Sequence, residues 1–270
     1  MPPVPEAPHV PRVIAVVGPG LIGTSVVLAA RRAWPGVEVR TIDQGQPLEL
    51  VRGCDIVVLA APVDAIIATL PQLAPFLSAH ALVIDTGSTK RAILAAARAG
   101  ALPRFVGGHP MAGGATTGPL GARADLFDGK PWFLIGPHAP VDAKEDAAAF
   151  VTGLGAQPVG MDDLGEAHDA LMAAVSHLPQ LAASALMIEV DAAVGREALH
   201  WAGTGLRDTT RLAASSADVW QSILLTNRDE VGPLLKLLAA RLGALADRLD
   251  DREEMARFFE AAARAKSSCL

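Results

Sequence analysis

The stretch Gly18-Pro19-Gly20-Leu21-Ile22-Gly23 decides the fold class of this chain, because it matches the G-x-G-x-x-G pattern of dinucleotide-binding turns. The apolar segment 13–17 before it is predicted to be a strand, and the alanine-rich segment 21–33 a helix. Asp43 stands at the end of the next predicted strand, 20 residues beyond Gly23. Strand, turn, helix and distal carboxylate together predict a Rossmann-type unit that binds a dinucleotide.

Each glycine of this turn has a separate predicted role. Gly18 makes the tight turn, Gly20 lets the backbone approach the pyrophosphate, and Gly23 lets the helix and strand pack closely. Leu21 and Ile22 open the helix, whose free N–H groups and positive dipole suit phosphates. The alternative is a glycine-rich turn that holds no ligand.

Asp43 favours NAD over NADP, because a carboxylate accepts hydrogen bonds from the ribose hydroxyls and repels a 2′-phosphate. Arg40 lies near Asp43 in the sequence, so NADP remains a possible cofactor. The small residues Ala60-Ala61-Pro62 follow the third predicted strand, so Ala61 and Pro62 are further candidates for a close approach of the cofactor to the backbone.

Strand-like and helical segments alternate through the first 160 residues, which predicts a doubly wound parallel sheet covered by helices. The predicted strands are 13–17, 37–42, 56–59, 82–84, 105–106, 132–135 and 157–159, with helices at 21–33, 63–69 and 89–99. Residues 164–265 are predicted to be successive helices broken at Gly195, at Gly203 to Gly205 and at Gly232-Pro233. The predicted domains are a disordered lead-in over 1–11, a dinucleotide-binding domain over 12–162 and an all-helical domain over 163–270.

Composition narrows the class of partner. The 270 residues correspond to about two domains, and 51 % hydrophobic residues place the chain with globular proteins. A net charge of −6 argues against nucleic acids and anionic membranes, so small metabolites are the expected partners.

The two cysteines, Cys54 and Cys269, have no disulfide or metal-ligand spacing, which favours a reducing compartment and no metal site. The proline-rich start does not resemble a signal peptide, and no apolar run is expected to span a bilayer. We therefore expect a cytoplasmic protein.

Two polar segments follow later strands. In Asp85-Thr86-Gly87-Ser88-Thr89-Lys90, Ser88 or Thr89 serves either as a helix N-cap or as part of a ligand site at the sheet edge. His109 opens the segment 109–113, which is predicted to be a loop after the fifth strand. Histidine suits a general base at neutral pH, although a loop histidine is often simply solvated.

These segments together resemble the prephenate/arogenate dehydrogenase family of tyrosine biosynthesis. The resemblance rests on the glycine turn 18–23, the segment 85–90 and the segment 109–113. In the helical part it continues with Ser176-His177-Leu178-Pro179, the segment 205–213, Trp220 and Asn227. It covers the chain from Arg12 to about Asp250.

The resemblance implies an oxidative decarboxylation, dependent on NAD or NADP, of prephenate to 4-hydroxyphenylpyruvate or of L-arogenate to tyrosine. In the family, a histidine that matches His109 takes the proton of the 4-hydroxyl while C4 delivers hydride to the nicotinamide. A serine that matches Ser88 hydrogen-bonds the same hydroxyl and orients the histidine. The ring then loses carbon dioxide and becomes aromatic.

Arg211 matches the family's carboxylate-binding arginine, a task that suits its planar fork of donors. His177 matches a second histidine of the substrate pocket, and Asp208 and Trp220 are further substrate-site candidates. Without the resemblance, Arg207, Asp208 and Arg211 would be an exposed ion-pair set, Trp220 a core residue and His177 a surface residue. The other histidines are predicted to be structural or solvated: His9, His80, His138, His168 and His200.

One departure concerns the residues after His109 to Gly113, where family members usually carry serine or threonine and then glutamate. This chain has Gly114-Ala115-Thr116-Thr117-Gly118 instead, which leaves open how the substrate side chain is recognised and keeps an amino-substituted analogue possible. The resemblance also implies a homodimer formed by the helical domain, and the leucines at 234, 238, 242 and 245 are compatible with it. No room for a regulatory or chorismate mutase domain follows, so a monofunctional enzyme is expected.

Two other functions stay open. A β-hydroxyacid-type dehydrogenase would share the two-domain outline, but it works through a lysine on the first long helix of its second domain. The lysines after Asp162 are Lys236 and Lys266, and neither lies there. A non-catalytic NAD-sensing module would need neither a histidine in the crevice nor a carboxylate-binding arginine.

Overall fold

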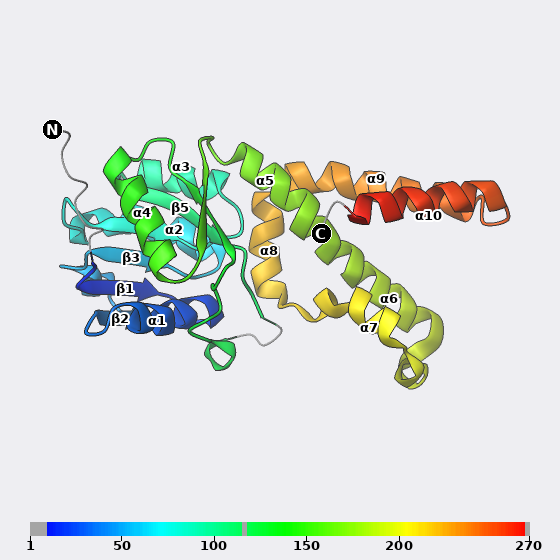
Figure 1. Ribbon diagram of the computed structural model, residues 1–270, viewed down its shortest axis with the longest axis horizontal. Coiled ribbons are helices and arrows are strands. Elements are labelled where there is room, and N and C mark those ends of the chain that lie inside the picture. The colour runs from blue at the N-terminus through cyan, green and yellow to red at the C-terminus, as the bar shows by residue number, and fades with distance from the viewer. Residues whose placement is uncertain (1–9, 115–117, 268–270) are drawn as a thin grey trace.

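One seven-stranded sheet, in the order β2-β1-β3-β4-β5-β6-β7, forms the first part of the computed structural model, which describes residues 10–114 and 118–267 (Figure 1). The strands are β1 Val13–Val17, β2 Glu38–Ile42, β3 Ile56–Leu59, β4 Leu82–Asp85, β5 Phe105–Pro110, β6 Pro131–Ile135 and β7 Gln157–Met161. The chain changes direction of winding between β1 and β3, so this is the position in the sheet where ligands bind at the carboxyl ends of the strands.

The sheet is mostly but not wholly parallel. Strands β1 to β5 run parallel, β6 runs antiparallel to β5, and β7 runs parallel to β6. The predicted Rossmann-type parallel sheet is therefore confirmed, with one antiparallel pair, β5–β6, that was not predicted. The physical reason is the β5–β6 connection, whose described residues contain no α-helix, whereas a parallel return requires a crossover that is usually helical.

Helices cover both faces of this sheet. The α-helices are α1 Leu21–Ala33, α2 Val63–Leu73, α3 Arg91–Ala99, α4 Val141–Gly153, α5 Glu166–Met172, α6 Leu178–Ala198, α7 Thr204–Thr209, α8 Ala217–Thr226, α9 Arg228–Ala246 and α10 Arg252–Ser267. One core joins alternate strand residues to α1 and α4, and the other joins the intervening residues to α2 and α3. Ile223 of α8 belongs to the second core, so the helical part is anchored on the α2–α3 face.

The helices after β7 extend away from the sheet as two arms, α6 on one side and the α9–α10 pair on the other (Figure 1). A break at Gly195 is confirmed, because this glycine adopts a positive φ inside α6. The break predicted at Gly232-Pro233 is wrong, since α9 runs through both residues. Proline removes a single hydrogen bond there, and the helix continues. The chain instead turns after Ala246 and before Arg252, which divides the predicted final helix in two.

The expectation that no apolar run could span a bilayer is wrong by length and composition. Helix α5, the π-helical turn Ala173–His177, α6 and a final 3₁₀ turn form one stretch, Glu166–Trp201, of 36 residues that is apolar enough to do so. Polar residues such as Ser176, His177 and Gln180 concealed this stretch in the sequence. Only 28 % of its most apolar window is buried within the chain, so much of its surface is open to a partner.

Candidate active site

The glycine turn after β1 has the geometry of a cradle for phosphate. Gly18 adopts φ +92°, and a Cβ there would lie 2.5 Å from the carbonyl oxygen of Ala60. A Cβ on Gly23 would lie 2.1 Å from the carbonyl oxygen of Gly18, so a side chain would separate α1 from the turn. A Cβ on Gly20 would meet no atom within 4 Å, and no side chain of the described residues caps α1 there. The helix N-terminus therefore faces open space that fits a pyrophosphate.

Asp43 and Arg40 lie on the same edge of the sheet but differ in their partners. Asp43 is exposed after β2, where its Oδ1 accepts the Gln44 N–H at 2.7 Å. The Arg40 guanidinium pairs with Glu38 and donates to the carbonyl oxygen of Arg52 at 2.8 Å, so it is bound to its own sheet edge. Ala61 and Pro62 lie after β3, directly before α2.

His109 lies within β5, and the prediction of a loop there is wrong. The strand runs to Pro110, and all six of its residues are buried. Glycine is required in this strand, because a Cβ on Gly108 would lie 2.3 Å from the carbonyl oxygen of Asp85 and 2.9 Å from Nε1 of Trp132. Two consecutive glycines thus serve close packing of a core strand and not chain flexibility, and they bring His109 to the carboxyl edge of the sheet.

A buried chain of hydrogen bonds begins at His109. Its Nδ1 lies 2.9 Å from Nε2 of His168, and Nδ1 of His168 lies 2.9 Å from Oδ1 of Asp169. His168 and Asp169 are fully buried, and His109 is 8 % exposed. The prediction that His168 has no functional constellation around it is therefore wrong, because α5 packs its first turn against β5.

The order of donors along this chain follows from the charge of Asp169. Burial raises the pKa of this carboxyl, but hydrogen bonds from His168 and from the N–H groups of Lys90 and Arg91 outweigh it, and the net pKa is lowered. Ionised Asp169 accepts the Nδ1 proton of His168, and the tautomer that this contact selects carries its lone pair on Nε2, which faces Nδ1 of His109. His109 consequently donates from Nδ1 and retains the lone pair on Nε2. Burial lowers the pKa of His109 well below its ordinary value and keeps the ring neutral, and the nearby ionisable groups of His168, Lys90 and His177 act in the same direction.

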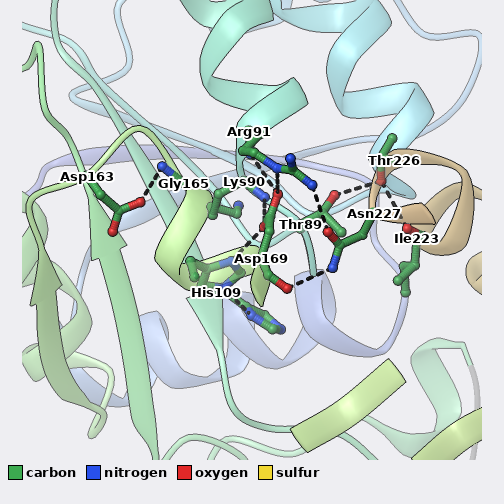
Figure 2. Close-up of polar contacts among 12 residues, drawn as sticks. Thr89, Lys90, Arg91, His109, Asp163, Gly165, Asp169, Ile223, Thr226 and Asn227 are labelled. Carbon is green, nitrogen blue, oxygen red and sulfur yellow. Dashed lines mark hydrogen bonds and ion pairs between the residues drawn. The ribbon is translucent and has the colours of Figure 1, made fainter. Parts of the chain in front are cut away.

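Asp169 also caps helix α3 of the sheet domain. Its two carboxylate oxygens accept the N–H groups of Lys90 at 2.7 Å and Arg91 at 3.1 Å. The Arg91 guanidinium reaches Asp169, Asn227 and Asp229, as Figure 2 shows for the first two. Neither Ser88 nor Thr89 caps this helix, so the N-cap alternative is wrong; Thr89 instead lies 2.9 Å from the hydroxyl of Thr226. An acidic residue from the helical part thus satisfies the helix end, where negative charge is favourable.

His177 forms the other buried edge of the site. Its Nδ1 lies 3.2 Å from the amide nitrogen of Asn227, which also donates to the carbonyl oxygen of Asp169. The ring packs edge-on against Trp220, with the centroids 5.8 Å apart. Burial lowers the pKa of His177 to about 4, so the ring is neutral, and acceptance at Nδ1 leaves the proton on Nε2. Among the described residues this Nε2 is buried without a hydrogen-bond partner, so it is free to donate to a ligand.

Comparison with known proteins identifies the family. The model of the prephenate dehydrogenase nucleotide-binding domain matches residues 24–159, and the model of the prephenate dehydrogenase dimerization domain matches residues 165–262. The chain belongs to the prephenate dehydrogenase family. Together the two models cover most of the chain, including His109 in the first domain and His168 and His177 in the second.

Individual relatives agree with this assignment to the prephenate dehydrogenase family. The prephenate dehydrogenase of Lactococcus lactis is 31 % identical over 92 % of this chain and 74 % of its own length. That of Bacillus subtilis is 32 % identical over 81 % of this chain and 65 % of its own length, so this chain spans about two thirds of that relative.

Two solved structures share the fold across both domains. Synechocystis arogenate dehydrogenase has a TM-score of 0.78 and 26 % identity, covering 96 % of this chain and 100 % of its own. Aquifex aeolicus prephenate dehydrogenase, solved with hydroxyphenyl propionate and NAD+, has a TM-score of 0.85 and 24 % identity, covering 96 % and 98 %. The chain is accordingly an oxidoreductase of this family, with a nicotinamide cofactor.

The other predicted site residues of this family member are distributed over both domains. Ser88 lies in the loop between β4 and α3, at the sheet edge that also carries His109. Arg211 opens the 3₁₀ turn Arg211–Ala214 and is exposed, as is Asp208 at α7. No ion pair joins Arg207, Asp208 and Arg211 in the described structure, so the ion-pair alternative is wrong. Gln180 ties this turn to α6, one helical turn beyond His177, by donating to the carbonyl oxygen of Leu212 at 2.8 Å.

Sequence reasoning missed four residues buried around His109. His168 and Asp169 continue its hydrogen-bond chain, and Asp85 and Lys90 bind the backbone of the preceding residue, Gly108. The adjacent pair His168-Asp169 at the start of the helical part was the available signal, since a buried histidine next to a carboxylate is a common orienting pair. The Gly114 to Gly118 segment, which departs from the family pattern, falls mostly on residues 115–117, outside the described residues, as do residues 1–9 of the lead-in and Cys269.

Proposed function

We propose that this enzyme catalyses the oxidative decarboxylation of prephenate, or of its amino counterpart L-arogenate, with transfer of hydride to NAD. The observation that carries the proposal is the buried chain His109–His168–Asp169, which gives a neutral imidazole with a basic Nε2 at the carboxyl edge of a dinucleotide-binding sheet. A β-hydroxyacid dehydrogenase or a non-catalytic NAD sensor is not favoured, because both domains match prephenate dehydrogenase models.

His109 would act as the general base. Its unprotonated Nε2 takes the proton of the substrate hydroxyl, and its Nδ1–H is held by His168. Bound NAD would supply the hydride acceptor for the hydroxyl-bearing carbon. Ionised Asp169 stabilises the positive charge that then develops on the imidazole pair, as a buried carboxylate does in a catalytic triad. Loss of carbon dioxide leaves an aromatic ring.

The substrate carboxylates would be held by one cation and one neutral donor. Arg211 offers a planar fork of N–H groups to a carboxylate, and His177 offers the unpartnered Nε2–H. Ser88 supplies a hydroxyl beside the base, and Asp208 and Trp220 complete the proposed substrate site. Neutral His177 suits a subsite that recognises an oxygen by a hydrogen bond, because burial disfavours its charged form.

NAD is the proposed cofactor, with Gly18, Gly20 and Gly23 forming the phosphate cradle and Leu21, Ile22, Ala61 and Pro62 lining it. Asp43 supports NAD over NADP, since its exposed carboxylate would repel a 2′-phosphate. Arg40 is not available to bind the 2′-phosphate of NADP, because its guanidinium already donates to Glu38 and to backbone carbonyl oxygens.

We also propose that the helical domain, residues 163–270, forms a homodimer in the cytoplasm, as its match to a dimerization-domain model supports. Apolar side chains are exposed on both arms of this domain: Leu186, Ile188 and Val194 of α6, and Leu235, Leu237 and Leu242 of α9. Burying such a surface in a partner subunit is favourable and accounts for the long apolar helix without a membrane. Sedimentation should give twice the chain mass of 27.9 kDa.

The decisive experiment mixes the purified protein with prephenate or L-arogenate and with NAD or NADP, and follows reduced nicotinamide by its absorbance. Turnover is expected with at least one pair, fastest with NAD. His109→Asn should abolish turnover while cofactor binding persists, and His138→Asn, an exposed histidine far from the relay, should not change it. Full activity of the His109 variant would refute its role as base.

A further inference from the structure

Lys90 and Asp85 form a fully buried ion pair beneath the proposed base, and both side chains are 0 % exposed. The ammonium of Lys90 donates to Asp85 and to the carbonyl oxygen of Gly108, the latter at 2.6 Å. The Asp85 carboxylate accepts the N–H of Gly108 at 2.9 Å and that of Gly87 at 2.7 Å. Both backbone polar groups of Gly108 are thus bound by this one pair.

This arrangement replaces a missing stretch of strand pairing. Strands β4 and β5 pair only at Val83–Phe105 and Ile84–Val106, because β4 ends at Asp85 and the chain turns away toward α3. On its other side β5 remains paired with β6 as far as Pro110. The side chains of Asp85 and Lys90 therefore supply the acceptor and the donor that a neighbouring strand would have offered to Gly108.

Stability alone does not explain a charged pair at this position. Removing two charges from water is costly, and well-packed apolar residues of similar size usually stabilise a core as much or more. What an apolar pair cannot do is bind the N–H and the carbonyl of Gly108. Gly108 immediately precedes His109, so fixing its N–H and carbonyl groups also fixes the backbone from which the His109 side chain projects.

We propose that Asp85 and Lys90 are positioning residues for the reaction, which hold the Gly108 peptide and thereby fix His109 against the substrate hydroxyl. The inference rests on the proposed role of His109 as the base. Neither residue is assigned contact with the reacting atoms; both act through the backbone of β5.

The charge of Lys90 gives this role a measurable signature. The titratable groups that act on His109 are His168 from α5, His177 from the π-helical turn and Lys90 from the start of α3. The positive charge of Lys90 helps to keep the pKa of His109 low, after burial and His168. Removal of that charge should raise the pKa of His109, whereas a merely structural defect would leave it in place.

The test compares Lys90→Met, Asp85→Asn and the double variant with the wild-type enzyme. Each single variant leaves one unpaired buried charge, a carboxylate in Lys90→Met and an ammonium in Asp85→Asn, and is at risk of not folding. The double variant removes both charges and avoids this risk. We expect kcat to fall by about 100-fold in each folded variant, with KM changed by less than about threefold, because a small displacement of the base costs rate and not affinity. The acid limb of kcat/KM against pH should move to higher pH in Lys90→Met, and by less in the double variant, because loss of the Asp85 negative charge there opposes the effect.

Two further measurements separate this inference from the proposed function. The side-chain nitrogen resonances of His109, assigned with the His109→Asn variant, report its pKa without any turnover. Leu70→Ala removes a fully buried side chain of α2 and should lower the melting temperature without changing kcat or the pH profile. A folded double variant with wild-type kcat and an unchanged His109 pKa would overturn the inference. If the wild-type enzyme were inactive but the pKa of His109 still differed between wild type and variants, only the proposed function would be overturned.

Discussion

His168 lies between His109 and Asp169, with its Nε2 2.9 Å from Nδ1 of His109. The two imidazoles come from different parts of the chain, His109 from β5 and His168 from α5, and their rings meet edge-on with centroids 5.1 Å apart. The tautomer of the proposed base is therefore set by a residue of the helical domain. The proton position that His109 needs to act as a base therefore depends on a contact between the two domains.

His168→Gln tests this dependence. Glutamine cannot transmit the orientation of Asp169 to His109 in the same way, so kcat should fall by about 100-fold or more while KM for the substrate changes little. Steady-state assays with the favoured substrate measure both constants. Combining His168→Gln with His109→Asn should cost no more than His109→Asn alone, and additive losses would contradict a shared role.

The glycines of the turn after β1 should separate binding from stability. In Gly20→Ala the new methyl group meets no protein atom, so the melting temperature should be unchanged while NAD affinity falls by about tenfold, a loss of about 1.4 kcal/mol. In Gly23→Ala the methyl group meets the Gly18 carbonyl at 2.1 Å, and stability should fall by about 1–3 kcal/mol. Calorimetric titration and thermal denaturation measure the two effects. Equal NAD affinity in Gly20→Ala would contradict the proposed cradle.

Arg211→Ala should raise KM for the substrate by about 10- to 100-fold, because a hydrogen bond to a charged group contributes about 1.5–3 kcal/mol. Cofactor affinity should stay as in the wild type. Arg207→Ala, a neighbouring exposed arginine of α7, is the matched control and should leave KM unchanged. If the two variants behaved alike, Arg211 would have no special part in substrate binding.

Stability should decline on acidification between pH 6.5 and about 4. The folded-state pKa of His177 is lowered from 6.5 to about 4 by burial, so the unfolded chain binds more protons in this range and the free energy of unfolding rises with pH. His177 alone contributes a change of about 3 kcal/mol, and His109, whose pKa is also lowered, adds to it. Urea denaturation at several pH values measures the slope. His177→Gln should flatten it, and an unchanged slope would place the titration elsewhere.

The sequence predicted the strands and the cofactor turn well, because local signals determine both. Glycines at positions 18, 20 and 23 stand at fixed offsets after an apolar strand, and each is required by its own packing or exposure. Most predicted strands lie within a few residues of the observed ones. The exception is β5, which was predicted to end at Val106 with the segment 109–113 as a loop, whereas the strand continues to Pro110 and its Gly108 allows close contact with Asp85 and Trp132. A glycine chosen for proximity and one chosen for flexibility look alike in a sequence.

The candidate site was predicted less completely, since its members meet only through tertiary packing. His109 was found from its place after a strand, but His168 looked isolated because 58 residues separate it from its nearest relay partner in β5. Lys90 and Asp85 stood in a motif whose polarity pointed to a ligand, and both are buried instead. No periodicity in the sequence indicates that α5 caps α3, because that contact depends on how the two domains pack.

The cap that Asp169 places on helix α3 has a consequence for synthesis of the chain. As domains generally fold from the N-terminus while translation proceeds, the sheet can assemble once residue 161 has left the ribosome. At that moment α3 still lacks the carboxylate that completes its first turn, and His109 lacks His168. The nascent domain is thus able to hold its shape before it is able to perform chemistry. Residues up to 169 supply the helix cap and the partner of His109, whereas the proposed substrate-binding residues His177 and Arg211 emerge only later.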